Sequence, residues 1–159
     1  MLSNRTRWTL IALAACLALG PAASLFAHCQ IPCGIFDDGI RFTEMLEDVT
    51  TIEKSMNQIN ELSGDKANFN QSVRWVMNKE EHANKLTETI TYYFMAQRIK
   101  APANDDAAAN EKYNKELRLM HGIMVHAMKA KQTTDTGHCE QLRDLIGQLK
   151  KSYMAGHEH

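Results

Sequence analysis

The sequence has little proline and no long apolar run after its first 27 residues. From residue 39 onward the only proline is Pro102, and no segment alternates apolar and polar residues as a half-buried strand would. No later segment approaches the ~18 uninterrupted apolar residues of a membrane-spanning helix. These absences argue against a β-sheet protein and against a membrane span once the first 27 residues are gone.

An excess of positive charge is also missing. The 159 residues include 18 Lys and Arg against 19 Asp and Glu, so composition gives no sign of a nucleic-acid-binding surface. A chain of this length with 44% hydrophobic residues is expected to form one domain around one core.

Residues 1–27 differ in composition from the rest of the chain. Arg5 and Arg7 precede an apolar run from Trp8 to Leu19, and small residues follow it. This order is typical of a secretory signal peptide, with cleavage after Ala27. We therefore expect residues 1–27 to be removed and residues 28–159 to be exported to the periplasm or the extracellular space.

Two details of this leader leave its processing open. Leu25, near the expected cut, is larger than the small side chain usual at that position. The stretch "LAAC", ending at Cys16, resembles a lipoprotein signal that ends in an acylated cysteine. We rank that alternative lower because apolar sequence continues past Cys16.

Apolar residues recur at steps of three and four in four later segments, which predicts four helices over 39–62, 68–99, 105–131 and 137–154. Short polar segments such as "SGDKAN" separate them. Amphipathic helices joined by short loops bury their apolar faces against one another, so the expected fold is an all-α, antiparallel, up-and-down four-helix bundle. In the second helix the predicted core seam is Phe69, Val73, Val76, Ala83, Ile90 and Phe94.

The nonapeptide "HCQIPCGIF", residues 28–36, stands directly after the expected cleavage site. Cleavage after Ala27 gives His28 a free amine beside its imidazole. Cys29 adds a thiol and a backbone amide, and Cys33 adds a second thiol. Pro32 stiffens the turn between them, so nitrogen and sulfur donors come together in a short N-terminal hook.

The donor set of this hook favours some metals over others. Structural zinc prefers four tetrahedral side-chain ligands, and the hook supplies only three. An amine, an amide and two thiolates can lie in one plane, an arrangement that suits Ni(II) or Cu(II). Because thiolates and an ionised amide donate electrons strongly, they favour a higher oxidation state and so a redox-active metal.

The motif His-Cys-x-x-Pro-Cys-Gly at an expected mature N-terminus, ahead of a four-helix bundle, closely resembles nickel superoxide dismutase. The resemblance implies one nickel ion per chain, bound by the amine and imidazole of His28, the amide and thiolate of Cys29 and the thiolate of Cys33. It implies cycling between Ni(II) and Ni(III) that converts superoxide to dioxygen and hydrogen peroxide. It further implies a homo-oligomer, a hexamer in the family, and a pocket wall formed by Gln30, Ile31, Pro32 and Phe36.

The resemblance also implies two residues that support the hook from outside. Glu44 and Arg74 stand at the distances from His28 that the family's histidine-orienting glutamate and neighbouring arginine have. We expect Arg74 to be partly buried, since its neighbours Val73 and Val76 belong to the predicted seam, and to attract the superoxide anion.

One position departs from the family pattern. Phe36 stands where the family usually has tyrosine, so this residue lacks a hydroxyl for small ligands or water. Tyr92, Tyr93 or Tyr113 is a candidate to compensate if it folds nearby.

Other interpretations of these residues remain open at this stage. Cys29 and Cys33 are also expected of a disulfide in an exported protein, and hence of a thiol redox module. The same hook suits an exported nickel- or copper-binding protein without dismutase turnover, an alternative that Phe36 favours. Cys139, beside apolar positions of the last helix, is predicted to be a buried thiol rather than a ligand.

Overall fold

The computed structural model describes residues 37–64, 68–103 and 105–155. These residues form α2 (Asp38–Leu62), α3 (Phe69–Glu88), η2 (Thr89–Arg98), α4 (Ala107–Gln132) and α5 (Gly137–Met154), and the described ranges contain no strand. The π-helix η2 continues α3 without a break, so the two make one of four rods. The predicted all-α class and four helical segments are confirmed, with boundaries that agree to within a few residues.

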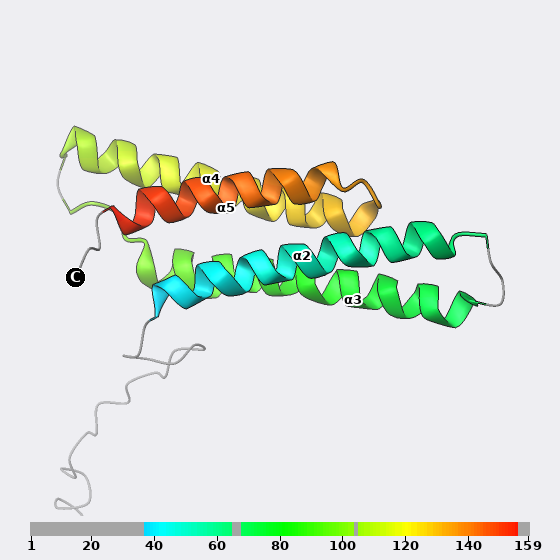
Figure 1. The fold of residues 1–159 in the computed structure, drawn as a ribbon. Helices are drawn as coiled ribbons and strands as arrows, with labels where there is room; N and C mark the ends of the chain where they lie inside the picture. Colours follow the sequence, from blue (N-terminus) through cyan, green and yellow to red (C-terminus); the bar gives the residue numbers. More distant parts are fainter. Residues whose placement is uncertain (1–36, 65–67, 104, 156–159) are drawn as a thin grey trace, which may run out of the picture.

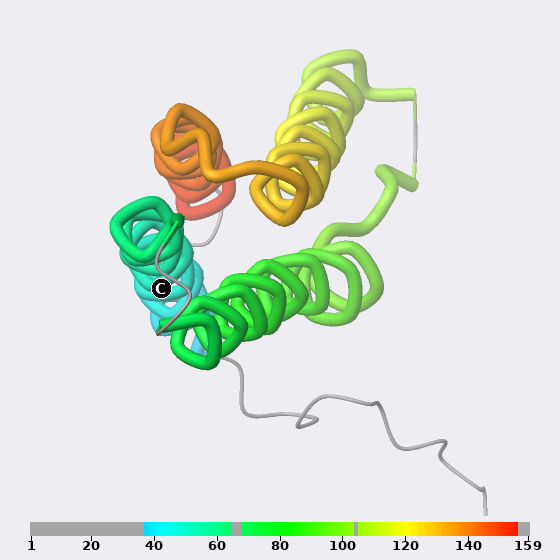
Figure 2. Tube along the Cα trace, turned by 90° about the vertical axis from the view of Figure 1, so that its right-hand side faces the viewer, coloured from blue at the N-terminus to red at the C-terminus, as the bar shows by residue number. Residues whose placement is uncertain are grey.

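The rods form two antiparallel pairs that pack into a bundle (Figure 1). α2 packs against α3 and α5, and α4 packs against the same two helices, so neighbours in the chain are neighbours in space. The end-on view of Figure 2 shows the four rods around a common centre. The start of α2, the end of η2, the start of α4 and the end of α5 meet at one end, which we call the anchor end (Figure 1).

The helix boundaries follow from local side-chain chemistry. The Asp37 carboxylate accepts a hydrogen bond from the Ile40 amide at 2.9 Å, and Asp106 caps the Ala108 and Ala109 amides in the same way. Gly64, with a φ of 93°, turns the chain after α2 in a conformation that other residues rarely adopt. The sequence therefore starts and stops these helices largely through residues at their ends.

The core lies along the apolar stripes that the periodicity predicts for α2 and α5. Phe42, Met45, Val49, Ile52 and Met56 of α2 are fully buried, as are Leu142, Ile146 and Leu149 of α5. Cys139 is also buried, with its Sγ 3.8 Å from the Met56 Sδ. Burial raises the pKa of its thiol to about 11, which confirms the predicted buried thiol.

The predicted seam of the second helix is wrong in its first half. Phe69, Val73 and Val76 are 71%, 40% and 41% exposed, whereas the later seam residues are buried. The cause is that α4 ends at the level of Lys79. The Lys79 Nζ donates to the carbonyls of Lys131 and Thr133, at the end of α4, at 2.8 and 2.7 Å.

The α2–α3 hairpin therefore extends beyond the α4–α5 hairpin, as Figure 1 shows. The first half of α3 has no part of α4 beside it, and its apolar side chains stay exposed. Within the described ranges, no helix combines the length and apolarity needed to cross a bilayer.

Candidate metal centre and its anchor

The hook residues His28, Cys29 and Cys33, and the expected pocket-wall residues Gln30, Ile31, Pro32 and Phe36, lie outside the described residues. The description begins at Asp37, four positions after Cys33, where the chain enters α2. In the described ranges no group of three or more His, Cys, Asp or Glu side chains is arranged to hold a metal ion.

Asp38, the first residue of α2, ties the entry of the chain to two other helices. Its carboxylate accepts hydrogen bonds from the Tyr93 hydroxyl at 2.6 Å and the Tyr153 hydroxyl at 2.8 Å. The Arg98 guanidinium donates to the same carboxylate through Nε at 2.9 Å and Nη2 at 2.6 Å. We call Asp38, Tyr93, Arg98 and Tyr153 the anchor cluster, since it fixes the backbone five residues after Cys33.

The π-helix explains how two residues of one rod reach the same carboxylate. Tyr93 and Arg98 are five residues apart, a spacing that in an α-helix leaves side chains well apart around the axis. In η2 the Ile99 amide donates to the Phe94 carbonyl, five residues back, at 2.8 Å. This wider winding places both side chains toward α2, and π-helical segments are frequent at functional sites.

Charge and burial fix the protonation states of the anchor cluster. Burial alone raises the pKa of Asp38, but the hydrogen bonds from Arg98, Tyr93 and Tyr153 outweigh it, so that pKa lies below its ordinary value. Burial and the bond to Asp38 raise the pKa of Tyr93 to about 12 and also raise the pKa of Tyr153. Asp38 is therefore ionised and both phenols are protonated at neutral pH.

Glu44 lies one and a half turns into α2, close to the hook in sequence and half exposed. Its Oε2 accepts from Arg41 Nη1 at 2.7 Å, and Arg41 also lies over the Tyr93 ring, 5.2 Å from its centroid. Among the described residues, the buried Arg41 Nε has no hydrogen-bond partner. The anchor end thus holds a carboxylate beside a guanidinium.

Arg74 lies far from Glu44 on the same pair of helices. Asn78 donates to the Ser55 hydroxyl at 3.0 Å, which sets the register of α3 against α2. Arg74, one turn before Asn78, is consequently level with the last turns of α2. At a rise of about 1.5 Å per residue it is roughly 20 Å along the axis from Glu44.

The expectation of a partly buried Arg74 is wrong, because the side chain is exposed on the part of α3 that extends past α4. Within one chain the structure does not bring Glu44 and Arg74 together. Four residues of extended chain span at most about 14 Å, which is shorter than the distance along the helix axis from Asp37 to the level of Arg74.

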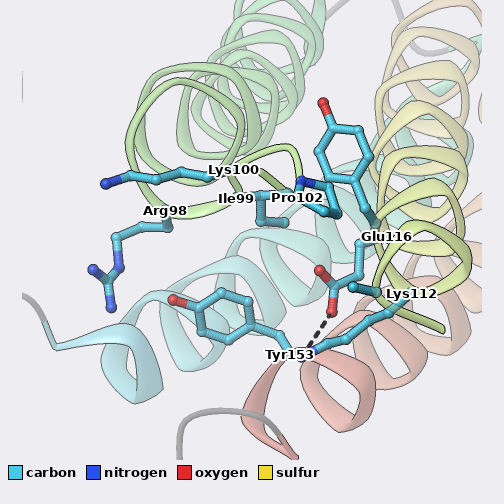
Figure 3. A pocket seen from close by; sticks show the side chains of 9 residues that line it. Arg98, Ile99, Lys100, Pro102, Lys112, Glu116 and Tyr153 are labelled. Carbon is cyan, nitrogen blue, oxygen red and sulfur yellow. Dashed lines mark ion pairs between the residues drawn. The ribbon is translucent and has the colours of Figure 1, made fainter. Parts of the chain in front are cut away.

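A pocket of about 400 Å³ opens at the anchor end, beneath the connection from η2 to α4 (Figure 3). Tyr153 and Arg98 lie on one side of it, and Glu116 faces it from α4. Glu116 is buried, accepts from the Ser152 hydroxyl at 3.0 Å and lies 3.8 Å from the Lys112 ammonium. The pocket is lined by Arg98, Ile99, Lys100, Pro102, Ala109, Lys112, Tyr113, Glu116 and Tyr153.

Of the tyrosines considered as substitutes for a hydroxyl at Phe36, only one belongs to the anchor cluster. Tyr93 is buried and its hydroxyl donates to Asp38, while Tyr92 is 45% exposed and Tyr113 lines the pocket. Sequence reasoning missed Asp38, because its partners stand 55, 60 and 115 residues away and no local pattern indicates them.

The described residues form a four-helix bundle, which places the protein in the all-α class. The family model of nickel-containing superoxide dismutase matches residues 23–156, which is most of the chain. The chain belongs to this family. No curated protein and no solved structure matched it in the corresponding searches.

Membership makes the protein a nickel-dependent oxidoreductase that converts superoxide to dioxygen and hydrogen peroxide. The match supports the dismutase over the two alternatives left open by the sequence, a metal-binding protein without turnover and a thiol redox module.

Proposed function

We propose that nickel binds at the N-terminal hook, residues 28–36, through His28, Cys29 and Cys33, with one ion per chain. The chemistry of the donor set supports this: an amine, an imidazole, an amide and two thiolates fit nickel in the geometry described above. When bound, nickel supplies one-electron exchange with superoxide between Ni(II) and Ni(III). No competing cluster of three potential ligands occurs among the described residues.

The anchor cluster holds the hook at one end of the bundle in this proposal. Asp38 fixes the start of α2 by bonds to η2 and α5, and Cys33 is five residues earlier. A ligand this close to a fixed backbone loses less entropy on binding than one on a free terminus. We therefore expect nickel binding to lose the least conformational entropy when the hook lies at the anchor end.

Glu44 is proposed to orient the His28 imidazole by accepting a hydrogen bond from its ring N–H. A metal-bound histidine commonly donates its second ring nitrogen to a carboxylate, which fixes its tautomer and direction. The bond from Arg41 engages Oε2 of Glu44, so the other carboxylate oxygen is the candidate acceptor for such a contact. Arg74 is level with the opposite end of α2, so it meets a hook only if that hook belongs to a neighbouring subunit.

The approach of superoxide is proposed to depend on cations at the anchor end. Lys100 supplies positive charge beside the pocket. The charges of Arg41, Lys112 and Arg98 are offset by Glu44, Glu116 and Asp38, respectively. A cluster of one sign of charge raises the encounter rate with a small anion.

The pocket wall is proposed to consist of Gln30, Ile31, Pro32 and Phe36. Phe36 has no hydroxyl, and Tyr93 is held protonated by its bond to Asp38 with a pKa of about 12. We therefore propose that Tyr93 stabilises the anchor cluster and does not deliver protons.

Homo-oligomer formation, with a hexamer as in the family, is proposed through the uncovered half of α3. Phe69, Val73, Val76 and Met77 are large apolar side chains at helical spacing, and all are exposed, Met77 by 66%. A contiguous apolar face of this kind marks an association surface. Val73→Glu is expected to lower the mass measured by light scattering, whereas Gln71→Glu, on the polar side of the same turn, is expected to leave it unchanged.

Export is proposed to precede assembly of the site, because removal of residues 1–27 creates the amine of His28. The protein then acts in the periplasm or the extracellular space. The decisive experiment compares a chain that begins at His28 with one that retains Ala27. Both are expected to show the same helical circular dichroism, and only the first is expected to bind one nickel and consume superoxide. Equal activity in the two chains would exclude the amine as a ligand.

A further inference from the structure

Two histidines of neighbouring helices face each other far from the anchor end. His126 belongs to the second half of α4 and His138 to the first turn of α5. Their Nδ1 atoms are 3.3 Å apart, and their ring centroids are 5.4 Å apart with the planes at 60°. The short connection between antiparallel helices brings them together across the contact between α4 and α5.

The separation of the two nitrogens is compatible with two ligands on one metal ion. At 3.3 Å it is also longer than the range of about 2.7–3.2 Å usual for an N–H···O hydrogen bond. Two nitrogens bound at about 2.0–2.1 Å are roughly 3.0 Å apart at a right angle and roughly 3.4 Å apart in a tetrahedron. The observed 3.3 Å lies between these two values.

The protonation state also suits a ligand. Burial, the neighbouring His138 and Lys129 together lower the pKa of His126 below its ordinary value. A neutral imidazole is the form that binds metal, and the His138 ring supplies the second nitrogen of the pair, with its Nδ1 3.3 Å from that of His126. The positive charge of Lys129 would repel a metal cation bound to His126. Because the Lys129 side chain is exposed, it can turn away from the two histidines.

We propose that His126 and His138 chelate a divalent late transition-metal ion, such as Zn²⁺, Cu²⁺ or Ni²⁺, through their Nδ1 atoms. Imidazole pairs suit these ions, and water completes the coordination, since no third His, Cys, Asp or Glu joins the pair within the described ranges. His138 precedes Tyr153 of the anchor cluster by fifteen residues of α5, which is about 22 Å. This site is separate from the hook and does not depend on it.

Zinc binding to the full chain tests this proposal. The variants are His126→Gln and His138→Gln, with His121→Gln as the matched control, because His121 lies on α4 but is exposed. In equilibrium dialysis at saturating Zn²⁺, each of the first two is expected to bind one zinc ion fewer than the parent, and the control is expected to bind as many. Other histidines and the hook cysteines are the same in every variant, so their contribution cancels. Equal zinc binding by all four proteins would overturn the proposal.

Nuclear magnetic resonance of the unsubstituted chain provides a second measurement that does not depend on how the variants fold. Addition of Zn²⁺ is expected to move the Nδ1 resonances of His126 and His138 together, with saturation at one equivalent for this pair. A shift of one ring alone, or of neither while other histidines respond, would overturn the assignment.

Discussion

Replacement of Asp38 by asparagine is predicted to destabilise the anchor end strongly. The Asp38 carboxylate accepts four hydrogen bonds, two from Arg98 and one each from Tyr93 and Tyr153. An asparagine of the same shape keeps one oxygen and presents an NH₂ group to a donor. At least part of the network then has no acceptor, and the Arg98 guanidinium loses its ion pair with Asp38.

The size of the effect follows from how much of this network is buried. Breaking a buried ion pair by removing one partner costs about 3–5 kcal/mol. The side chains of Arg98 and Asp38 are 23% and 12% exposed, so water recovers some of the loss, and we expect about 2–4 kcal/mol. Glu53→Gln is the matched control, because Glu53 pairs with Arg143 at the same 2.6 Å but with 31% and 36% exposure, and about 1 kcal/mol or less is expected.

Urea unfolding followed by circular dichroism measures both variants against the parent. The pKa of Asp38 is lowered from 3.8 in the folded state, so its stabilising contribution is present above pH 3.8 and is lost as pH falls through the folded pKa. Asparagine does not titrate, so the difference in free energy of unfolding between the parent and Asp38→Asn should become smaller below pH 3.8. If Asp38→Asn lowers the free energy of unfolding at neutral pH by no more than Glu53→Gln does, the reasoning is refuted.

Three further predictions concern other parts of the bundle. Lys79→Met should lower the free energy of unfolding by about 2 kcal/mol, because the carbonyls of Lys131 and Thr133 lose a charged donor; an unchanged urea midpoint would contradict this. Cys139 should resist alkylation at pH 8 in the folded protein, because its pKa is about 11, and mass spectrometry should find its peptide modified only after unfolding. Glu44→Gln should lower superoxide turnover or nickel affinity about 10–100-fold while leaving the helical signal intact, and unchanged values of both would remove its proposed role.

The helices of this bundle were predictable because their causes are local. Stripes of apolar residues, the caps at Asp37 and Asp106 and the turn at Gly64 depend on neighbours within a few positions, and the boundaries follow them. Burial in α3 was not predictable in the same way. Val73 has the spacing of a core residue, but whether a helix covers it depends on where α4 ends, and Lys79 marks that point.

The sequence could propose a hook because its candidate donors His28, Cys29 and Cys33 are consecutive or nearly so along the chain. The residues that would support the hook from other helices could not be predicted in this way. The family spacing from His28 indicated both Glu44 and Arg74, but the antiparallel register separates these two residues by roughly 20 Å along the helix axis.

By itself the sequence determined the class of the fold and the family, since each depends on periodicity or on short-range order along the chain. Only the tertiary structure decided which side chains meet across helices, such as Asp38 with Tyr153 and His126 with His138. The physical reason is that such contacts depend on helix length, register and the wider winding of η2. Those properties come from packing all four rods together rather than from any one segment.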